Sequence, residues 1–152
     1  MGIAALVVWI LTAGGGSYLL AQWVSGGGHR RASATRFPPA LIFGHFLLAA
    51  AGLVLWIIYL MMHKHPVGWA ALILLALAAV AGLTMFALWV PSYRSRRAGV
   101  TPGRQQPAVT AAAPGEHAPE RSFPVTIVAA HGLLAVTTLV LVVLSMLGIG
   151  TG

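Results

Sequence analysis

The segment "RFPPALIFGHFLLAAAGLVLW", residues 36–56, places a single histidine, His45, inside a run that is otherwise apolar. No charged side chain occurs between Pro38 and Met62. A helix rises 1.5 Å per residue, so this run is long enough to cross a hydrocarbon core of about 30 Å. An ionisable side chain at that depth is costly and marks a candidate functional residue. The segment therefore predicts a transmembrane helix that carries a site.

Three further apolar runs are long enough to span a membrane, and they cover residues 3–24, 67–90 and 124–149. All four runs are continuous rather than alternating with a period of two residues, which excludes a β-barrel. We therefore expect an all-α, polytopic membrane protein with one domain over residues 1–152. The expected architecture is a four-transmembrane-helix bundle built as two parallel helix pairs. The short segment "MMHKHPVG", residues 61–68, predicts that the second and third helices are antiparallel neighbours.

The composition supports a membrane protein. Of the 152 residues, 59% are apolar and only 7% are charged, whereas a soluble domain carries roughly 25% charged residues. Cysteine is absent, so disulfides and thiolate metal ligands are excluded. The two acidic residues, Glu116 and Glu120, lie outside the apolar runs, which excludes carboxylate catalysis within the bilayer. We expect an electron-transfer or accessory subunit rather than a stand-alone catalyst.

The net charge of +7 indicates topology rather than nucleic-acid binding, because its distribution is one-sided. Eight arginines fall in the first and third connections, and Lys64 is the single basic residue of the second; the arginines are Arg30, Arg31, Arg36, Arg94, Arg96, Arg97, Arg104 and Arg121. The positive-inside rule then places the first and third connections in the cytoplasm and both termini outside the cell membrane. Residues 91–123, rich in proline, alanine and glycine, are expected to form a flexible cytoplasmic loop.

An internal repeat doubles the opening segment, because residues 37–55 align with residues 123–141 at an offset of 86. Phe37, Pro38 and His45 match Phe123, Pro124 and His131. Proline suits the first turn of a helix, so both helices are expected to begin at the same face of the membrane and run in one direction. Each histidine follows its proline by seven residues, or about 10 Å along the axis. A pseudo-two-fold axis along the membrane normal would bring the two imidazoles face to face.

The paired imidazoles favour one haem b. Two histidines are a poor ligand set for tetrahedral zinc, which takes four ligands, but they fill the two axial positions of an iron held in a porphyrin. We therefore predict His45 and His131 as metal ligands. Residues expected to line the cofactor are small or polar neighbours, together with two arginines that suit haem propionates: Gly44, Gly52, Ala130, Gly132, Ala135, Thr137, Thr138, Arg36 and Arg121.

This pattern of paired histidines on apolar helices resembles the four-helix, bis-histidine b-type membrane cytochromes, such as cytochrome b561-like proteins and the haem anchor subunits of respiratory complexes. The resemblance implies electron relay between a cytoplasmic or quinol donor and a partner redox protein or membrane-complex subunit, with lipid around the bundle and a quinone as a further partner. Cytochrome b561 proteins usually use four histidines for two haems, whereas this chain has two at membrane depth. A partner that continues the electron path is therefore expected.

Two other functions stay open from the sequence. The chain would be a cofactor-free accessory or assembly subunit if the paired histidines hydrogen-bond across a helix interface. The same two histidines would also suit copper, a quinone contact or proton handling. A copper-handling protein is the other alternative, through the histidines and methionines of "MMHKH", residues 61–65. If it binds no copper, this segment is a cap between the second and third helices at the membrane–water interface. The "GGGS" segment, residues 14–17, would allow a kink in the first helix or an approach of its backbone to a cofactor or a neighbouring helix, and close helix packing is the favoured interpretation.

Overall fold

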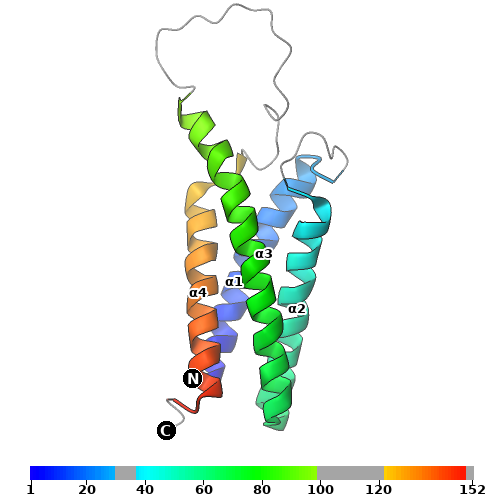
Figure 1. Cartoon of the computed structure of the whole chain (residues 1–152), viewed down its shortest axis with the longest axis vertical. Coiled ribbons are helices and arrows are strands. Elements are labelled where there is room, and N and C mark those ends of the chain that lie inside the picture. The colour runs from blue at the N-terminus through cyan, green and yellow to red at the C-terminus, as the bar shows by residue number, and fades with distance from the viewer. Residues whose placement is uncertain (30–36, 99–121, 150–152) are drawn as a thin grey trace, which may run out of the picture.

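A computed structural model describes residues 1–29, 37–98 and 122–149, and in these ranges the chain is helical without any strand (Figure 1). The helices are α1 (Gly2–Ser25), α2 (Pro39–Met62), α3 (His65–Ala98) and α4 (Val125–Met146). All four are long and apolar enough to cross a membrane. The predicted all-α bundle of four transmembrane helices is confirmed. Prolines precede α2 and α4, as expected from residues whose fixed φ suits the entry to a helix.

The main departure from the sequence-based boundaries is in α3. This helix continues through Pro91 to Ala98, so residues 91–98, predicted to begin a loop, are helical. Proline lacks an N–H and removes one hydrogen bond of the helix ladder, but this loss does not end the helix here. The last turns of α3 rise above the neighbouring helices (Figure 1). The remaining part of the predicted loop, residues 99–121, lies outside the described residues.

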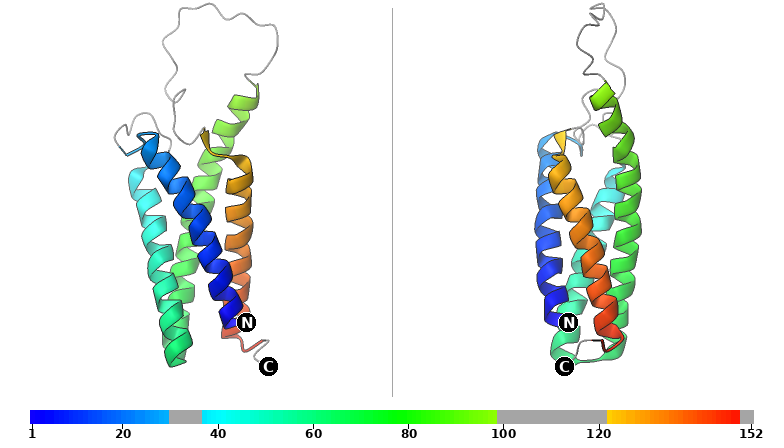
Figure 2. Two further views of the ribbon diagram at one scale, coloured as in Figure 1. Left: turned by 180° about the vertical axis from the view of Figure 1, so that it is seen from behind. Right: turned by 90° about the vertical axis from the view of Figure 1, so that its left-hand side faces the viewer.

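The helices alternate in direction, so that α1 is parallel to α3 and α2 is parallel to α4 (Figures 1 and 2). The beginning of α1 and the end of α4 consequently lie at the same end of the bundle, which we call the terminal end, and the opposite end is the loop end. The most extensive packing joins antiparallel neighbours, α2 with α3 and α1 with α4. The members of each parallel pair face each other diagonally across the bundle. The connection between α2 and α3 consists of His63 and Lys64, and His63 adopts a left-handed backbone conformation with φ 53°.

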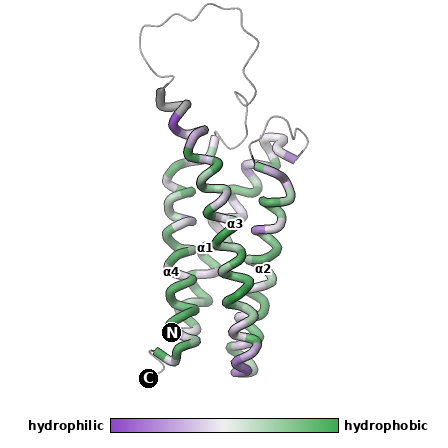
Figure 3. Tube along the Cα trace, in the orientation of Figure 1, coloured by the Kyte–Doolittle hydropathy of each residue, from purple (hydrophilic) through white to green (hydrophobic). Residues whose placement is uncertain are grey.

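Two apolar clusters fill the interior. The terminal-end cluster comprises Ala5, Trp9, Trp56, Ala71, Leu75, Val142 and Met146. The loop-end cluster comprises Trp23, Phe37, Ile42, Trp89 and Phe123. The hydropathy of the helices is consistent with this arrangement, because polar residues concentrate near the bundle ends (Figure 3). The terminal-end cluster takes side chains from all four helices, and the loop-end cluster takes them from α1, α2, α3 and the residues just before α2 and α4.

The structure reveals a second repeat, in which α1 matches α3 at an offset of 66 residues. The matching pairs are Gly2 with Gly68, Ala5 with Ala71, Gly16 with Gly82, and Trp23 with Trp89. Their surroundings match too. A Cβ on Gly2 would touch Leu60 of α2 and Ser145 of α4, and a Cβ on Gly68 would touch Met146 and Tyr59, which are the 86-residue equivalents of the first pair. The chain is therefore a tandem repeat of two helices with pseudo-two-fold symmetry.

Candidate functional site

The imidazole rings of His45 and His131 lie close to each other in the interior of the bundle. Their centroids lie 6.2 Å apart and their planes are inclined by 71°. His45 is on α2 and His131 is on α4, which face each other diagonally, so the pair bridges the bundle interior. Each histidine is the seventh residue of its helix, which puts the pair closer to the loop end than to the terminal end. The structure thus brings together the two histidines that the first repeat singles out.

The histidines occupy a layer between the two apolar clusters. On α2 the layer lies between Ile42 of the loop-end cluster and Trp56 of the terminal-end cluster. On α1 it lies between Trp23 and Trp9. Both imidazoles are half-buried. The layer therefore places two polar rings between apolar caps.

Backbone carbonyls hold both rings in place. Nδ1 of His45 lies 2.8 Å from the carbonyl oxygen of Ala78 on α3, and Nδ1 of His131 lies 2.9 Å from the carbonyl oxygen of Thr12 on α1. A carbonyl oxygen only accepts hydrogen bonds, so each Nδ1 carries the hydrogen and donates it. In a neutral imidazole the lone pair is then on Nε2. Within the described residues, neither Nε2 has a hydrogen-bond partner.

Two glycines allow this close approach of ring to helix. A Cβ on Gly16 would lie 2.9 Å from Cε1 of His131, and a Cβ on Gly82 would lie 3.1 Å from Cε1 of His45. Both distances are shorter than ordinary carbon contacts, which begin near 3.5 Å. From the sequence, close packing was the favoured interpretation of Gly16, and Gly82 was not identified. The 66-residue repeat of α1 and α3 would have identified both.

The three glycines predicted to line a cofactor have different surroundings. A Cβ on Gly44 or Gly132 would meet no other side chain or neighbouring helix within 4 Å, so neither residue admits the opposite ring. Gly52 is buried, and its Cβ would lie 3.1 Å from Cζ2 of the Trp9 ring. The absence of a side chain at Gly52 thus makes room for Trp9 in the terminal-end cluster, two turns beyond His45. The role of Gly52 as a cofactor-lining residue stays a prediction.

The other predicted neighbours are distributed over several environments. Ala135 is half-buried one turn beyond His131, whereas Ala130 is exposed. The hydroxyl of Thr137 donates to the Leu133 carbonyl within α4 and faces outward. Thr138 is buried, and its hydroxyl oxygen lies 3.2 Å from that of Thr12. Arg36 and Arg121 lie outside the described residues.

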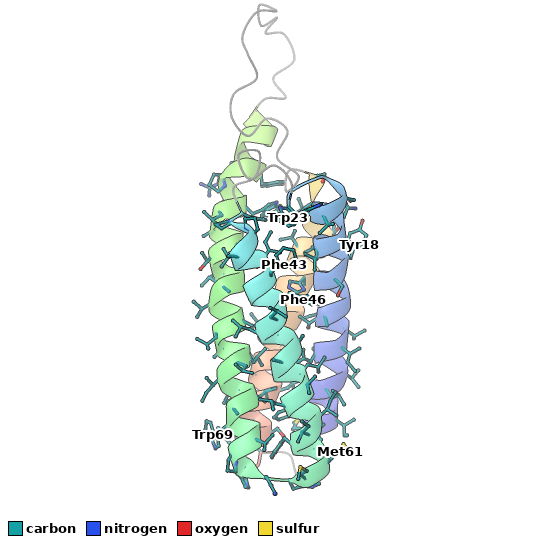
Figure 4. The ribbon with its side chains drawn as sticks, turned by 90° about the vertical axis from the view of Figure 1, so that its right-hand side faces the viewer. Tyr18, Trp23, Phe43, Phe46, Met61 and Trp69 are labelled. Carbon is teal, nitrogen blue, oxygen red and sulfur yellow. The ribbon has the colours of Figure 1, made fainter. Side chains whose placement is uncertain are left out.

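The "MMHKH" segment lies at the opposite end of the bundle from the aromatic residues around Trp23 (Figure 4). His63 and His65 are exposed, and the ring of His65 lies 6.5 Å from the ring of Tyr59. Met61 is 78% exposed. Within the described part of the chain, no group of three or more histidine, cysteine or acidic residues is placed to hold a metal ion. The segment forms the cap and turn between α2 and α3.

The separation of the two imidazole centroids, 6.2 Å, is close to the separation of two imidazole ligands of one metal ion. A bond from an imidazole nitrogen to a metal is about 2.0 Å long, so two rings on opposite sides of one ion have centroids roughly 6 Å apart.

Comparisons of the chain with known protein families, with curated proteins and with solved structures find no match.

Proposed function

We propose that this chain is a b-type haem-binding membrane protein in which His45 and His131 are the axial ligands. The observation that carries the proposal is the pair of Nε2 atoms, each left with its lone pair by a hydrogen bond at Nδ1, on rings whose centroids are 6.2 Å apart. Its task is to relay electrons between a cytoplasmic or quinol donor and a partner subunit. Haem supplies the one-electron chemistry when it is bound.

The donor set favours haem over a bare metal ion. Structural zinc takes four protein ligands, and the described residues place only two imidazoles at this depth. A porphyrin provides four in-plane nitrogens and leaves two axial positions for the protein. The chain contributes neutral ligands, apolar caps on both sides of the layer, and backbone carbonyls that hold the rings. Burial and hydrogen bonding of the axial ligands are two of the features by which a protein sets the potential of such a centre.

The orientation of the bundle is part of the proposal. Arginines in the connection after α1, in the last turns of α3 and in the connection after α3 favour a cytoplasmic location for the loop end, by the positive-inside rule. The histidine pair then belongs to the cytoplasmic leaflet of the cell membrane. A centre at that depth does not by itself carry electrons across the membrane, so a partner redox protein or membrane-complex subunit completes the path.

The visible spectrum of the purified full-length protein tests this proposal. We expect a Soret band and reducible α and β bands at about one haem per chain. His45→Ala and His131→Ala should each abolish the bis-histidine spectrum because each removes one of two axial ligands. His63→Ala, at the exposed turn, is the matched control and should keep it. A colourless protein from cells supplied with excess haem would overturn the proposal.

A second candidate is a cofactor-free accessory subunit, and the packing of the rings favours it. The inclined rings lie in edge-to-face contact and each is anchored to a carbonyl of a neighbouring helix, so the pair also joins the four helices without any cofactor. On this alternative, the purified protein is colourless. His45→Ala and His131→Ala then lower its thermal stability without any spectral change.

A further inference from the structure

We infer that Gly16 and Gly82 are positioning residues that set the orientation and the tautomer of the two imidazoles, so that both coordinate through Nε2. The inference deepens the proposed function and rests on it for the identity of the ligand. The positions of the two rings are set by residues of this chain, whatever ligand they bind. The inference follows from two features of the structure: the steric relation of each glycine to a ring and its carbonyl acceptor, and the recurrence of that relation in the repeat.

The first feature is steric. In an α-helix each Cβ is tilted toward the N-terminus and covers the turn before its own residue. The carbonyl that accepts the hydrogen bond of His131 belongs to Thr12, four residues before Gly16. A side chain at position 16 would cover that carbonyl, and its Cβ would lie 2.9 Å from Cε1 and 3.5 Å from Nδ1 of His131. The missing Cβ thus uncovers the acceptor and makes room for the ring.

The second feature is the recurrence of the same arrangement on α3. The acceptor for His45 is Ala78, again four residues before the glycine. A Cβ on Gly82 would lie 3.1 Å from Cε1 and 3.5 Å from Nδ1 of His45. The carbonyl, glycine and histidine therefore form the same unit twice, related by the offsets of 66 and 86 residues. The recurrence of this unit at both histidines is expected if a ligand between the two rings requires both rings to be held in position.

The chemical consequence concerns the free nitrogen. A ring that loses its carbonyl acceptor can place the hydrogen on either nitrogen, whereas a ring held at Nδ1 offers Nε2 alone. Hydrogen bonding at Nδ1 also raises the basicity of an imidazole ligand, and removal of such a partner typically costs about 10- to 100-fold in metal affinity. Gly16 and Gly82 act on the ligand through the histidines and do not need to touch it.

The test begins with the full-length, haem-free protein in lipid nanodiscs, labelled with 15N-histidine. Long-range 1H–15N correlation distinguishes the Nδ1–H tautomer from the Nε2–H tautomer. Wild-type protein should show Nδ1–H for His45 and His131. Gly16→Ala should release His131 alone, and Gly82→Ala should release His45 alone. The matched controls are Gly14→Ala and Gly44→Ala, because a Cβ at either position meets nothing within 4 Å beyond its own helix.

Folding does not obscure the result. Glycine to alanine within a helix raises helix propensity by about 1 kcal/mol, so loss of helix is not the expected cause of a change, and far-UV circular dichroism verifies this. Gly82→Ala has the longer contact and is the second variant if Gly16→Ala does not accumulate. Retention of the Nδ1–H tautomer in Gly16→Ala and Gly82→Ala, as in the controls, would overturn the inference.

A separate measurement links the inference to the proposed function. In protein that retains haem, Gly16→Ala and Gly82→Ala should weaken haem binding about 10- to 100-fold and raise the midpoint potential, because a less basic axial ligand stabilises the oxidised iron less. Equal affinity and potential in wild type and both variants would contradict the role toward haem. A chain that never binds haem overturns the proposed function, while the tautomer experiment still decides the positioning.

Discussion

The hydroxyl oxygens of Thr12 and Thr138 lie 3.2 Å apart in the buried interface between α1 and α4. The equivalent positions in the other half of the repeat are Ala78 and Gly52, so this polar contact has no counterpart between α3 and α2. Each hydroxyl also lies within hydrogen-bond distance of a carbonyl oxygen one turn earlier in its own helix. The two halves of the bundle therefore differ in polarity: the interface of α1 with α4, which includes His131, contains a polar pair that the interface of α3 with α2 lacks.

Thr138→Val removes one hydroxyl from this pair with little change of shape. We expect a loss of stability of about 0.6 kcal/mol, the average for hydrogen bonds between transmembrane helices. A double-mutant cycle with Thr12→Val, measured by reversible unfolding in mixed micelles, should give a coupling energy of that size. Thr137→Val is the control because its hydroxyl bonds only within α4. No coupling between Thr12 and Thr138 would contradict the contact.

Gly52→Ala should destabilise the bundle without affecting the histidine pair. Its Cβ would lie 3.1 Å from the Trp9 ring and 3.4 Å from Cβ of Leu74, and overpacking of this kind costs about 1–3 kcal/mol. The thermal unfolding midpoint measures the loss. Gly44→Ala on the same helix should leave the midpoint unchanged or raise it. If Gly52→Ala instead changed the haem spectrum at full stability, Gly52 would belong to the cofactor site.

Trp56→Phe removes a buried indole N–H that lies 3.3 Å from the carbonyl oxygen of Gly2. The ring is fully buried in the terminal-end cluster, so both the hydrogen bond and some packing are lost. We expect a destabilisation on the order of 1 kcal/mol by chemical denaturation. Trp69→Phe is the control because Trp69 is 48% exposed and should change stability little. Equal effects of the two substitutions would argue against the buried contact.

The absence of cysteine allows a direct test of orientation, because any introduced thiol is the only one in the chain. Lys64→Cys lies at the exposed turn between α2 and α3, and Ser25→Cys lies at the exposed end of α1. By the positive-inside rule, a membrane-impermeant maleimide added to intact cells should label position 64 and should label position 25 only after permeabilisation. The reverse pattern would place the histidine pair in the outer leaflet.

Much of the fold was predictable because long apolar runs leave few alternatives. The bounds of α1 and α2 agree with the sequence to within one residue at each end. The extension of α3 was not predictable, since Pro91 usually ends or kinks a helix and the residues after it are not apolar. The approach of His45 to His131 followed from a Phe-Pro pair placed at equal distance before each histidine.

The glycine contacts were harder to predict for two physical reasons. Gly16 and Gly82 repeat at an offset of 66, whereas the histidines repeat at 86, because α3 extends further than α1 and the connection after α3 is also longer. A comparison at one offset therefore finds only half of the repeat. Gly52 shows the second reason. It shares a helix face with His45, but two turns separate them, and the sequence does not show that the Trp9 ring occupies that space.

The pairing of α1 with α4 has a consequence for the biosynthesis of the protein. Synthesis proceeds from α1 to α4, so the Thr12 carbonyl on α1 is made well before the His131 ring on α4 that it holds. By contrast, α2 and α3 are consecutive in the chain and pack on each other directly. The pair of His45 and His131 is therefore complete only when all four described helices have been synthesised.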